Sequence, residues 1–218
     1  MSDESLFREV DEEVRQAQFK KLWARYGNLV IAVCIVVIIG VAGFQGWRYW
    51  QKKQAEEAGD SFFAAAELAA SGKADEAAKQ FDGVSHGGFA ALAKLREAAV
   101  LARDGKTDEA VKIYDAVAAD GSADATTRDV ARIRAAAALA DTAAYADVEA
   151  RLKPFDAEGN PWRHVAREIM VATQWRLKDY AGADRHVQAI LGDAETPPAL
   201  RQRAQLMAQL LQPLVTAK

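Results

Sequence analysis

The stretch GKADEA at residues 72–77 returns as GKTDEA at residues 105–110, and this repetition decides the fold of the chain. The two copies lie 33 residues apart, and apolar residues on both sides of them also correspond. Looser copies occur at residues 145–148 and 180–183, so the spacings run from 33 to 38 residues. A period of this length is typical of stacked helical hairpins.

The centre of each repeat has the residues that a turn between two helices needs. Gly72 and Gly105 suit the left-handed conformation that ends a helix, and Asp75 and Asp108 place negative charge at the start of the next helix. Each repeat is therefore expected to form a hairpin like the tetratricopeptide unit of about 34 residues. Small and large apolar residues at matching places are expected to pack these hairpins: Ala77, Ala110 and Ala183, with Phe81, Tyr114, Leu152 and Val187.

The later repeats depart from this pattern. Val148 stands where the other copies have a small residue, and Pro154 is expected to end or bend the second helix of the third repeat. Pro197 and Pro198 interrupt the chain near its end, and residues 199–211 have the pattern of an amphipathic closing helix. The array is thus predicted to have about four degenerate hairpins and a helix that covers the last one.

A membrane-spanning helix is predicted ahead of the repeats. Residues 26–47 are 22 consecutive residues without a charge, and as a helix they would extend about 33 Å, against about 30 Å for the hydrocarbon core of a bilayer. Trp23 and Tyr26 lie at one end and Trp47, Tyr49 and Trp50 at the other, where aromatic rings favour the headgroup region. The predicted fold class is therefore all-α, with one N-terminal transmembrane helix followed by a tetratricopeptide-like α-solenoid.

The chain divides accordingly into a charged cytoplasmic tail at 1–25, a transmembrane helix at 26–50, a linker and first helix at 51–71, and a repeat domain at 58–218. A cleavable signal peptide is the alternative interpretation of the apolar segment. Signal peptides have a shorter apolar region, of about 7 to 15 residues, and a short basic leader. The leader here is long and carries both signs of charge, so the segment is interpreted as a retained anchor.

The orientation rests on a small excess of basic residues on the amino side of the span. Arg15, Lys20, Lys21 and Arg25 precede the segment, while Arg48, Lys52 and Lys53 follow it. The positive-inside rule then favours a cytoplasmic N-terminus with the repeats outside the cytoplasm, and the opposite orientation stays open. Within the span, Gly40, Ala42, Gly43 and Gly46 would let another membrane helix approach closely, although glycine is common in such helices in any case.

Composition excludes several classes of function. The chain has 218 residues and a net charge of −3, and its Lys and Arg are spread among Asp and Glu, which argues against nucleic acid as a partner. Its single cysteine, Cys34, rules out a disulfide framework and a thiolate metal site within one copy. The three histidines are far apart, and no motif for catalysis, a metal or a cofactor is recognisable. We therefore expect neither an enzyme nor a cofactor.

A binding groove is predicted on the first helix of each hairpin, which lines the concave surface in tetratricopeptide folds. Aligning the repeats brings one row of small residues together, flanked by apolar positions, and Trp and Arg residues lie near it, as at interface hot spots. The residues assigned to this groove are Leu92, Leu95, Arg103, Val130, Ile133, Val165, Trp175 and Arg176. The alternative interpretation is that these positions form helix-packing core, or that the linker helix covers them.

The order of parts, a short charged tail, one span, an Ala-rich helical linker and about four degenerate hairpins, resembles the YfgM family of bacterial inner-membrane proteins. The resemblance covers nearly the whole chain in architecture and includes no catalytic motif. It implies an ancillary subunit of the Sec translocon, with the repeat domain in the periplasm and a membrane-anchored periplasmic chaperone as a partner.

The expected function is therefore that of a non-catalytic, membrane-anchored adaptor that binds a chaperone or translocating chains. Tethering would raise the local concentration of its binding surface without any added contact. The alternative is a homo-oligomeric membrane scaffold whose repeat domain could face the cytoplasm. It would use the small residues of the span and the repeat surface to assemble copies of the chain.

Overall fold

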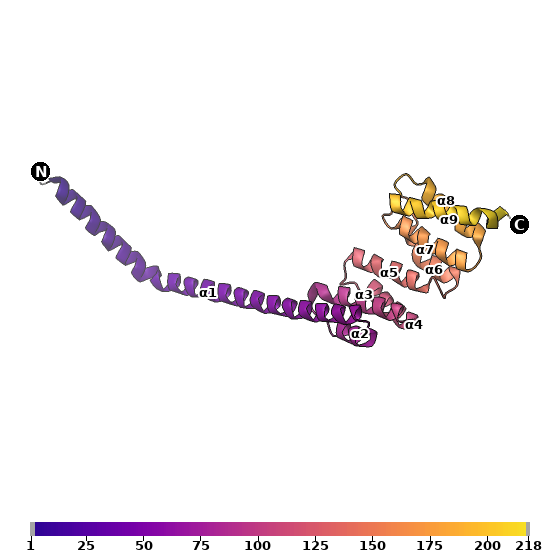
Figure 1. Cartoon of the computed structure of the whole chain (residues 1–218). Helices are drawn as coiled ribbons and strands as arrows, with labels where there is room; N and C mark the ends of the chain where they lie inside the picture. The colour runs from indigo at the N-terminus through magenta and orange to yellow at the C-terminus, as the bar shows by residue number, and fades with distance from the viewer. Residues whose placement is uncertain (1–2, 217–218) are drawn as a thin grey trace. The chain divides into compact units, whose positions relative to one another are not determined.

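The structure is a computed structural model that describes the backbone of residues 3–216 and the side chains of residues 20, 21, 23–86 and 88–216. Within residues 3–216 it contains nine α-helices, one short 3-10 helix and no strand (Figure 1). The prediction of an all-α chain is confirmed. The predicted charged tail at residues 1–25 lies in large part outside the described side chains.

The chain forms two compact units, residues 1–54 and 55–218, and helix α1 (Asp3–Ala70) belongs to both. In the first unit every residue from 28 to 50 is exposed, so this apolar stretch contains no buried side chain. Within the stretch Trp23–Ala70 an 18-residue window reaches a mean hydropathy of 2.6, and this helix is long and apolar enough to cross a membrane. The expected long apolar helix at the N-terminal end is thus present.

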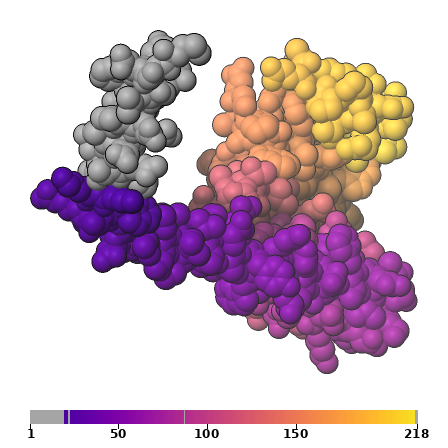
Figure 2. Space-filling view, turned by 90° about the vertical axis from the view of Figure 1, so that its left-hand side faces the viewer, coloured from indigo at the N-terminus to yellow at the C-terminus, as the bar shows by residue number. Residues whose placement is uncertain are grey.

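The second unit is an array of helical hairpins, in which each helix packs on the next and α5 also lies beside α3 and α7. The order of the chain is kept along the array, with α2 and α3 at one end and α9 at the other (Figure 2). The prediction of four hairpins and a closing helix is confirmed. The helices that follow α1 are α2 (Ala74–Asp82), α3 (Gly87–Arg103), α4 (Thr107–Ala119), α5 (Ala125–Leu139), α6 (Tyr145–Leu152), α7 (Arg163–Arg176), α8 (Tyr180–Gly192) and α9 (Pro198–Thr216).

The turns of the hairpins use the predicted glycines. Gly72 has φ 82° and Gly105 has φ 83°, the left-handed region that glycine adopts without strain. Each is followed by a backbone hydrogen bond that closes the turn, from Lys73 to the carbonyl of Leu68 in the first case. In the fourth hairpin Lys178 occupies the corresponding place with φ 62°, a left-handed residue with a side chain that the sequence pattern does not indicate.

The positions predicted to pack the hairpins are buried. The small residues Ala77, Ala110 and Ala183 are fully buried, and Val148 is equally buried at the corresponding place in the third hairpin. The larger residues beside them have at most 2% of their surface exposed: Phe81, Tyr114, Leu152 and Val187. Close-packed side chains of this kind give each hairpin its own apolar cluster.

Proline lies at the end of α6 and at the start of α9, as expected, but α9 is longer than predicted. Helix α6 ends at Leu152, and Pro154 lies in the 3-10 turn Lys153–Phe155 that follows. Helix α9 begins at Pro198, where the missing N–H costs nothing in the first turn. It then continues to Thr216, past Pro213 and beyond the predicted end at residue 211, because Leu211 and Val215 pack on the core of the last hairpin.

Candidate partner-binding surface

The first helices of the second, third and fourth hairpins present matching side chains at intervals of four, three and four residues. This spacing places them on one side of each helix. We call these residues the inner face: Leu92, Arg96, Ala99 and Arg103 on α3, Val130, Arg134 and Ala137 on α5, and Val165, Ile169, Ala172 and Arg176 on α7.

The inner face is accessible along its length. Leu92 is 41% exposed. Ala137 and Ala172 are exposed, while Val130 and Val165 are half-buried. The surface therefore combines exposed small residues with partly exposed apolar ones.

Three residues of the predicted groove lie instead in the packing between helices. Ile133 is 6% exposed and belongs to the core of the third hairpin. Leu95 is half-buried between α3 and its neighbours. Trp175 packs edge-on against Tyr180, with ring centroids 5.4 Å apart, in the cluster below α9.

The two predicted arginines differ in their contacts. Arg103 is exposed. The guanidinium of Arg176 donates to the carbonyl oxygen of Ala140 at 2.8 Å and to that of Ala143, so it fastens α7 to the turn between α5 and α6. The side chain of Arg176 therefore has a structural partner.

Sequence reasoning missed Arg96, Arg134 and Ile169. Each follows a predicted residue, Leu92, Val130 or Val165, by four positions and therefore lies one helical turn further along the same face. The aligned repeats place these three residues at the same position. Two of them are charged and one is apolar, so the position does not stand out as a row of similar residues. Arg96 and Arg134 are both exposed.

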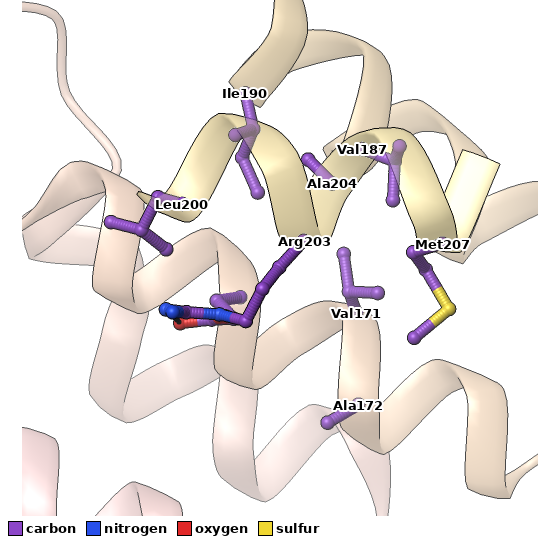
Figure 3. A pocket seen from close by; sticks show the side chains of 9 residues that line it. Val171, Ala172, Val187, Ile190, Leu200, Arg203, Ala204 and Met207 are labelled. Carbon is purple, nitrogen blue, oxygen red and sulfur yellow. Dashed lines mark hydrogen bonds and ion pairs between the residues drawn. The ribbon is translucent and has the colours of Figure 1, made fainter. Parts of the chain in front are cut away.

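An apolar pocket of about 240 Å³ lies beside the inner face, between α7, α8 and α9 (Figure 3). Arg203 extends from α9 and forms two hydrogen bonds to the carboxylate of Glu168 on α7, at 2.6 and 3.0 Å. This ion pair forms a polar edge on a pocket that is otherwise lined by carbon. The apolar lining residues are Val171, Ala172, Val187, Ile190, Leu200, Ala204 and Met207.

The pocket exists because α9 packs on α8 and makes only slight contact with α7. Ala172 on α7 and Ala204 on α9 are too small to fill the space that remains between those helices. Its volume is below the roughly 300 to 1,000 Å³ of sites for drug-sized ligands, so it suits one or two apolar side chains of a protein partner.

A second, more polar pocket lies at the start of α7 and is bordered by charged residues that serve the fold. Arg163 is 5% exposed and donates to Asp193 at 2.6 and 3.2 Å and to Glu195 at 2.6 Å. These bonds hold the pKa of Asp193 well below its usual range. Each strong donor and acceptor here has a partner within the protein, which is the pattern of a structural network.

The same network surrounds His164, which is 5% exposed. Its Nδ1 lies 3.3 Å from the hydroxyl of Thr196, and burial lowers its pKa. The described residues contain no group of three or more His, Cys, Asp or Glu that could hold a metal ion.

The small residues of the apolar segment leave open space beside α1. A Cβ added at Gly40, Gly43 or Gly46 would meet no atom within 4 Å, apart from the local helix backbone, and Ala42 is exposed. This part of α1 therefore has room for the close approach of another helix.

An array of helical hairpins with an accessible inner face is the form of a tetratricopeptide-type scaffold, a class of domain that mediates protein–protein interaction. The profile of the tetratricopeptide repeat-like domain family matches residues 20–169, more than half of the chain, and the protein belongs to that family. The match ends within α7, so α8 and α9 lie beyond it. Searches of curated proteins and of solved structures found no match.

Proposed function

We propose that this protein is a membrane-anchored, non-catalytic adaptor whose inner face binds partner proteins. The observation that carries the proposal is the accessible apolar surface of α3, α5 and α7, which continues into the apolar pocket between α7, α8 and α9. Membership of a tetratricopeptide-like family supports a role in binding rather than catalysis. The long apolar stretch of α1 would supply the anchor.

The resemblance to the YfgM family extends this proposal to a location and to partners. The N-terminus would lie in the cytoplasm and the repeat domain in the periplasm of a bacterial cell, beside the Sec translocon and a membrane-anchored chaperone. Gly40, Ala42, Gly43 and Gly46 would then be the contact with a membrane helix of the translocon or the chaperone. The four basic residues Arg15, Lys20, Lys21 and Arg25 before the span, against Arg48, Lys52 and Lys53 after it, support this orientation.

Within the proposed adaptor, the pocket between α7 and α9 would receive an apolar side chain of the partner. Anchoring residues of this kind contribute most of the binding energy when they fill a desolvated pocket at the centre of an interface. Leu92, Arg103, Val130 and Val165 would make the surrounding contacts. Leu95, Ile133, Trp175 and Arg176 would support the surface from within.

A homo-oligomeric scaffold is the second candidate function, and one observation favours it. Leu206, Leu210 and Leu214 form an exposed stripe at four-residue intervals on α9, with 57%, 56% and 39% of their surfaces exposed. The end of a helical array is normally polar, because that surface faces water. An apolar stripe there would suit contact between two copies of the chain.

Topology and site-specific crosslinking together test the adaptor proposal. A reporter active only in the periplasm, fused after the last residue, is expected to be active, and a cytoplasmic reporter at the same point is expected to be silent. A photo-crosslinking amino acid in place of Leu92 or Ala172 is expected to capture the translocon or chaperone subunit, whereas the same amino acid at exposed Lys112 on α4 captures neither.

The opposite reporter pattern would show that the repeats lie in the cytoplasm, and it would contradict the proposed partners. Crosslinks only between copies of the chain would favour the homo-oligomeric scaffold. Equal capture from Leu92, Ala172 and Lys112 would remove the inner face as the binding surface.

A further inference from the structure

Charge is divided unequally between the two sides of the array. Helices α3, α5 and α7, the first helices of their hairpins, together contain nine Lys or Arg and three Asp or Glu. The second helices of the same three hairpins, α4, α6 and α8, contain three Lys or Arg and six Asp or Glu. The net charge of −3 of the whole chain hides this separation.

The acidic side has a local explanation. Asp75 and Glu76 lie in the first turn of α2, and Asp108 and Glu109 lie in the first turn of α4. Negative charge in that position is stabilised by the partial positive charge at the start of a helix. These four acidic residues therefore need no binding partner to account for them.

Most basic residues of the first helices have partners within the fold. Lys94, Arg132, Arg163 and Arg167 pair with carboxylates, and Arg176 binds carbonyl oxygens. Arg132 pairs with Asp129 on its own helix, while the other four join their helices to neighbouring segments.

Three arginines of the inner face are different. Among the described residues, no side chain or carbonyl forms a hydrogen bond or ion pair with Arg96, Arg103 or Arg134, and all three are exposed. Arg103 is in the last turn of α3, where a cation stabilises the helix end. Arg96 and Arg134 lie in the interior of their helices, and neither the helix nor a neighbour accounts for them.

These arginines stand beside the apolar residues of the same surface. Arg96 and Arg103 flank Ala99 on α3, and Arg134 lies between Val130 and Ala137 on α5. A guanidinium on the edge of an apolar strip can pair with a carboxylate in two-point contact while its carbon chain covers a neighbouring apolar group. The surface is therefore complementary to a ligand that is acidic and apolar at once.

We propose that the inner face binds an acidic, amphipathic segment of another protein. Its carboxylates pair with Arg96, Arg103 and Arg134, and its apolar side chains lie against Leu92, Ala99 and Ala137. This assignment rests on the proposed adaptor function and adds the chemical class of the partner. Charge complementarity makes the association faster and makes it dependent on salt, because the pairs form on an exposed surface.

The test uses the full-length chain in nanodiscs of zwitterionic lipid and fluorescence anisotropy at low salt. The probe is a labelled helical peptide with Leu at every third or fourth position and Glu at most others. Two matched peptides replace either every Glu with Lys or every Leu with Ser. Arg96→Glu with Arg134→Glu is the variant, and Lys112→Glu with Arg185→Glu on the second helices is its control, with the same change of charge.

The Glu-Leu peptide is expected to bind, and the Arg96→Glu, Arg134→Glu variant is expected to raise its Kd about tenfold or more. The Lys112→Glu, Arg185→Glu control is expected to change the Kd less than about threefold, and the Lys-Leu and Glu-Ser peptides to bind much more weakly. The neutral variant, Arg96→Gln with Arg134→Gln, should be intermediate. Thermal unfolding by circular dichroism checks that each variant is folded.

Equal losses in the two charge-reversed variants would show only general attraction to charge and would overturn the proposal. Equal binding of the Lys-Leu peptide, or no binding of the Glu-Leu peptide, would also overturn it. So would self-association of the wild-type chain that Arg96→Glu with Arg134→Glu abolishes, because the face would then bind a second copy. If crosslinking from Leu92 captures a partner through a basic or neutral segment, the adaptor function stands and this inference fails.

Discussion

The first two hairpins and the last one are held together by different kinds of contact. Around α2 and α3 the interior is aromatic and aliphatic: Phe62, Phe81 and Phe89 form a cluster whose ring centroids lie 5.4 to 5.8 Å apart about Phe62. Charged pairs there, such as Lys106 with Asp75, lie on the surface. Around α7 and α8 a buried arginine, Arg163, joins the start of α7 to the loop after α8.

The difference shows that a helical hairpin can be closed by apolar packing or by a buried ion network. Apolar packing needs only the right size and periodicity, and residues of similar volume can replace one another. A buried guanidinium needs all its partners at once, because an unpaired charge in the interior is very unfavourable. The two regions should therefore respond differently to substitution, to pH and to changes in the turns.

The largest effect is expected for Phe81→Ala in the apolar region. Phe81 is 1% exposed and packs edge-on against Phe62, so the substitution leaves a cavity in a cluster built on a short helix. We expect a loss of about 3 to 5 kcal/mol in the free energy of unfolding, measured by urea denaturation with circular dichroism. Phe63→Ala is the control: Phe63 is 68% exposed, and a change within about 0.5 kcal/mol is expected. Equal losses in both variants would contradict the assigned packing.

The next largest effect is expected for Arg163→Met in the ionic region. The substitution keeps most of the side-chain volume but leaves Asp193 without its main partner, at a site where burial penalises an unpaired charge. We expect Tm to fall by roughly 5 °C or more, measured by differential scanning calorimetry. Arg96→Met, at an exposed arginine without a partner, should leave Tm almost unchanged. A Tm equal to that of the wild type would show that the network adds little to stability.

Smaller effects on stability are expected from substitutions at two corresponding turn positions, and the two effects should have opposite signs. Gly105→Ala forces a Cβ into a left-handed conformation and should destabilise the domain by about 1 kcal/mol. Lys178→Gly removes that strain from the fourth hairpin and should stabilise it by a few tenths of a kcal/mol up to about 1 kcal/mol, less any loss from greater freedom of the unfolded chain. Urea denaturation of both variants measures the difference. If Lys178→Gly destabilises the domain, the lysine side chain has a compensating role.

The smallest effect is expected from mild acidification, and it should act on the last hairpin first. Burial lowers the pKa values of His164 and His186, which both lie in that region. As the pH falls below about 6.5, the ordinary pKa of histidine, the unfolded chain takes up protons before the folded chain does, so these histidines reduce stability with decreasing pH. Above that pH these histidines do not make the stability depend on pH.

Hydrogen exchange at pH 7.5 and 5.5 would locate this loss. We expect faster exchange in α7 and α8 at the lower pH, with little change in α2 and α3. His164→Gln should reduce the difference, because glutamine does not titrate. A uniform response of both regions would contradict a local origin.

Sequence predicted the hairpins well because their signals are local. The glycines of the GKADEA and GKTDEA copies and the alanines that follow them lie within a few residues of the turn they shape, and the structure confirms their roles. Lys178 was not foreseen as left-handed, because a lysine carries no such preference and only the path of the chain imposes it.

The ionic network lay beyond sequence reasoning for a different reason. Arg163 and Asp193 are 30 residues apart, and nothing in the local pattern connects them. In the proposed binding surface, the aligned rows identified Leu92, Val130 and Val165. Ile133 and Trp175 are packed between helices, because the rotation of each helix about its own axis decides which edge of an apolar stripe faces the neighbour.

The guanidinium of Arg176, bound to the carbonyls of Ala140 and Ala143, has a consequence for how the array unfolds. The contact joins one hairpin to the turn of the preceding one, and Arg151 on α6 pairs with Asp115 on α4 in the same sense. In a linear array, such links between nearest neighbours determine whether repeats melt one by one or together. Here the two arginines couple three successive hairpins, so fraying at the C-terminal end should loosen the middle of the domain as well.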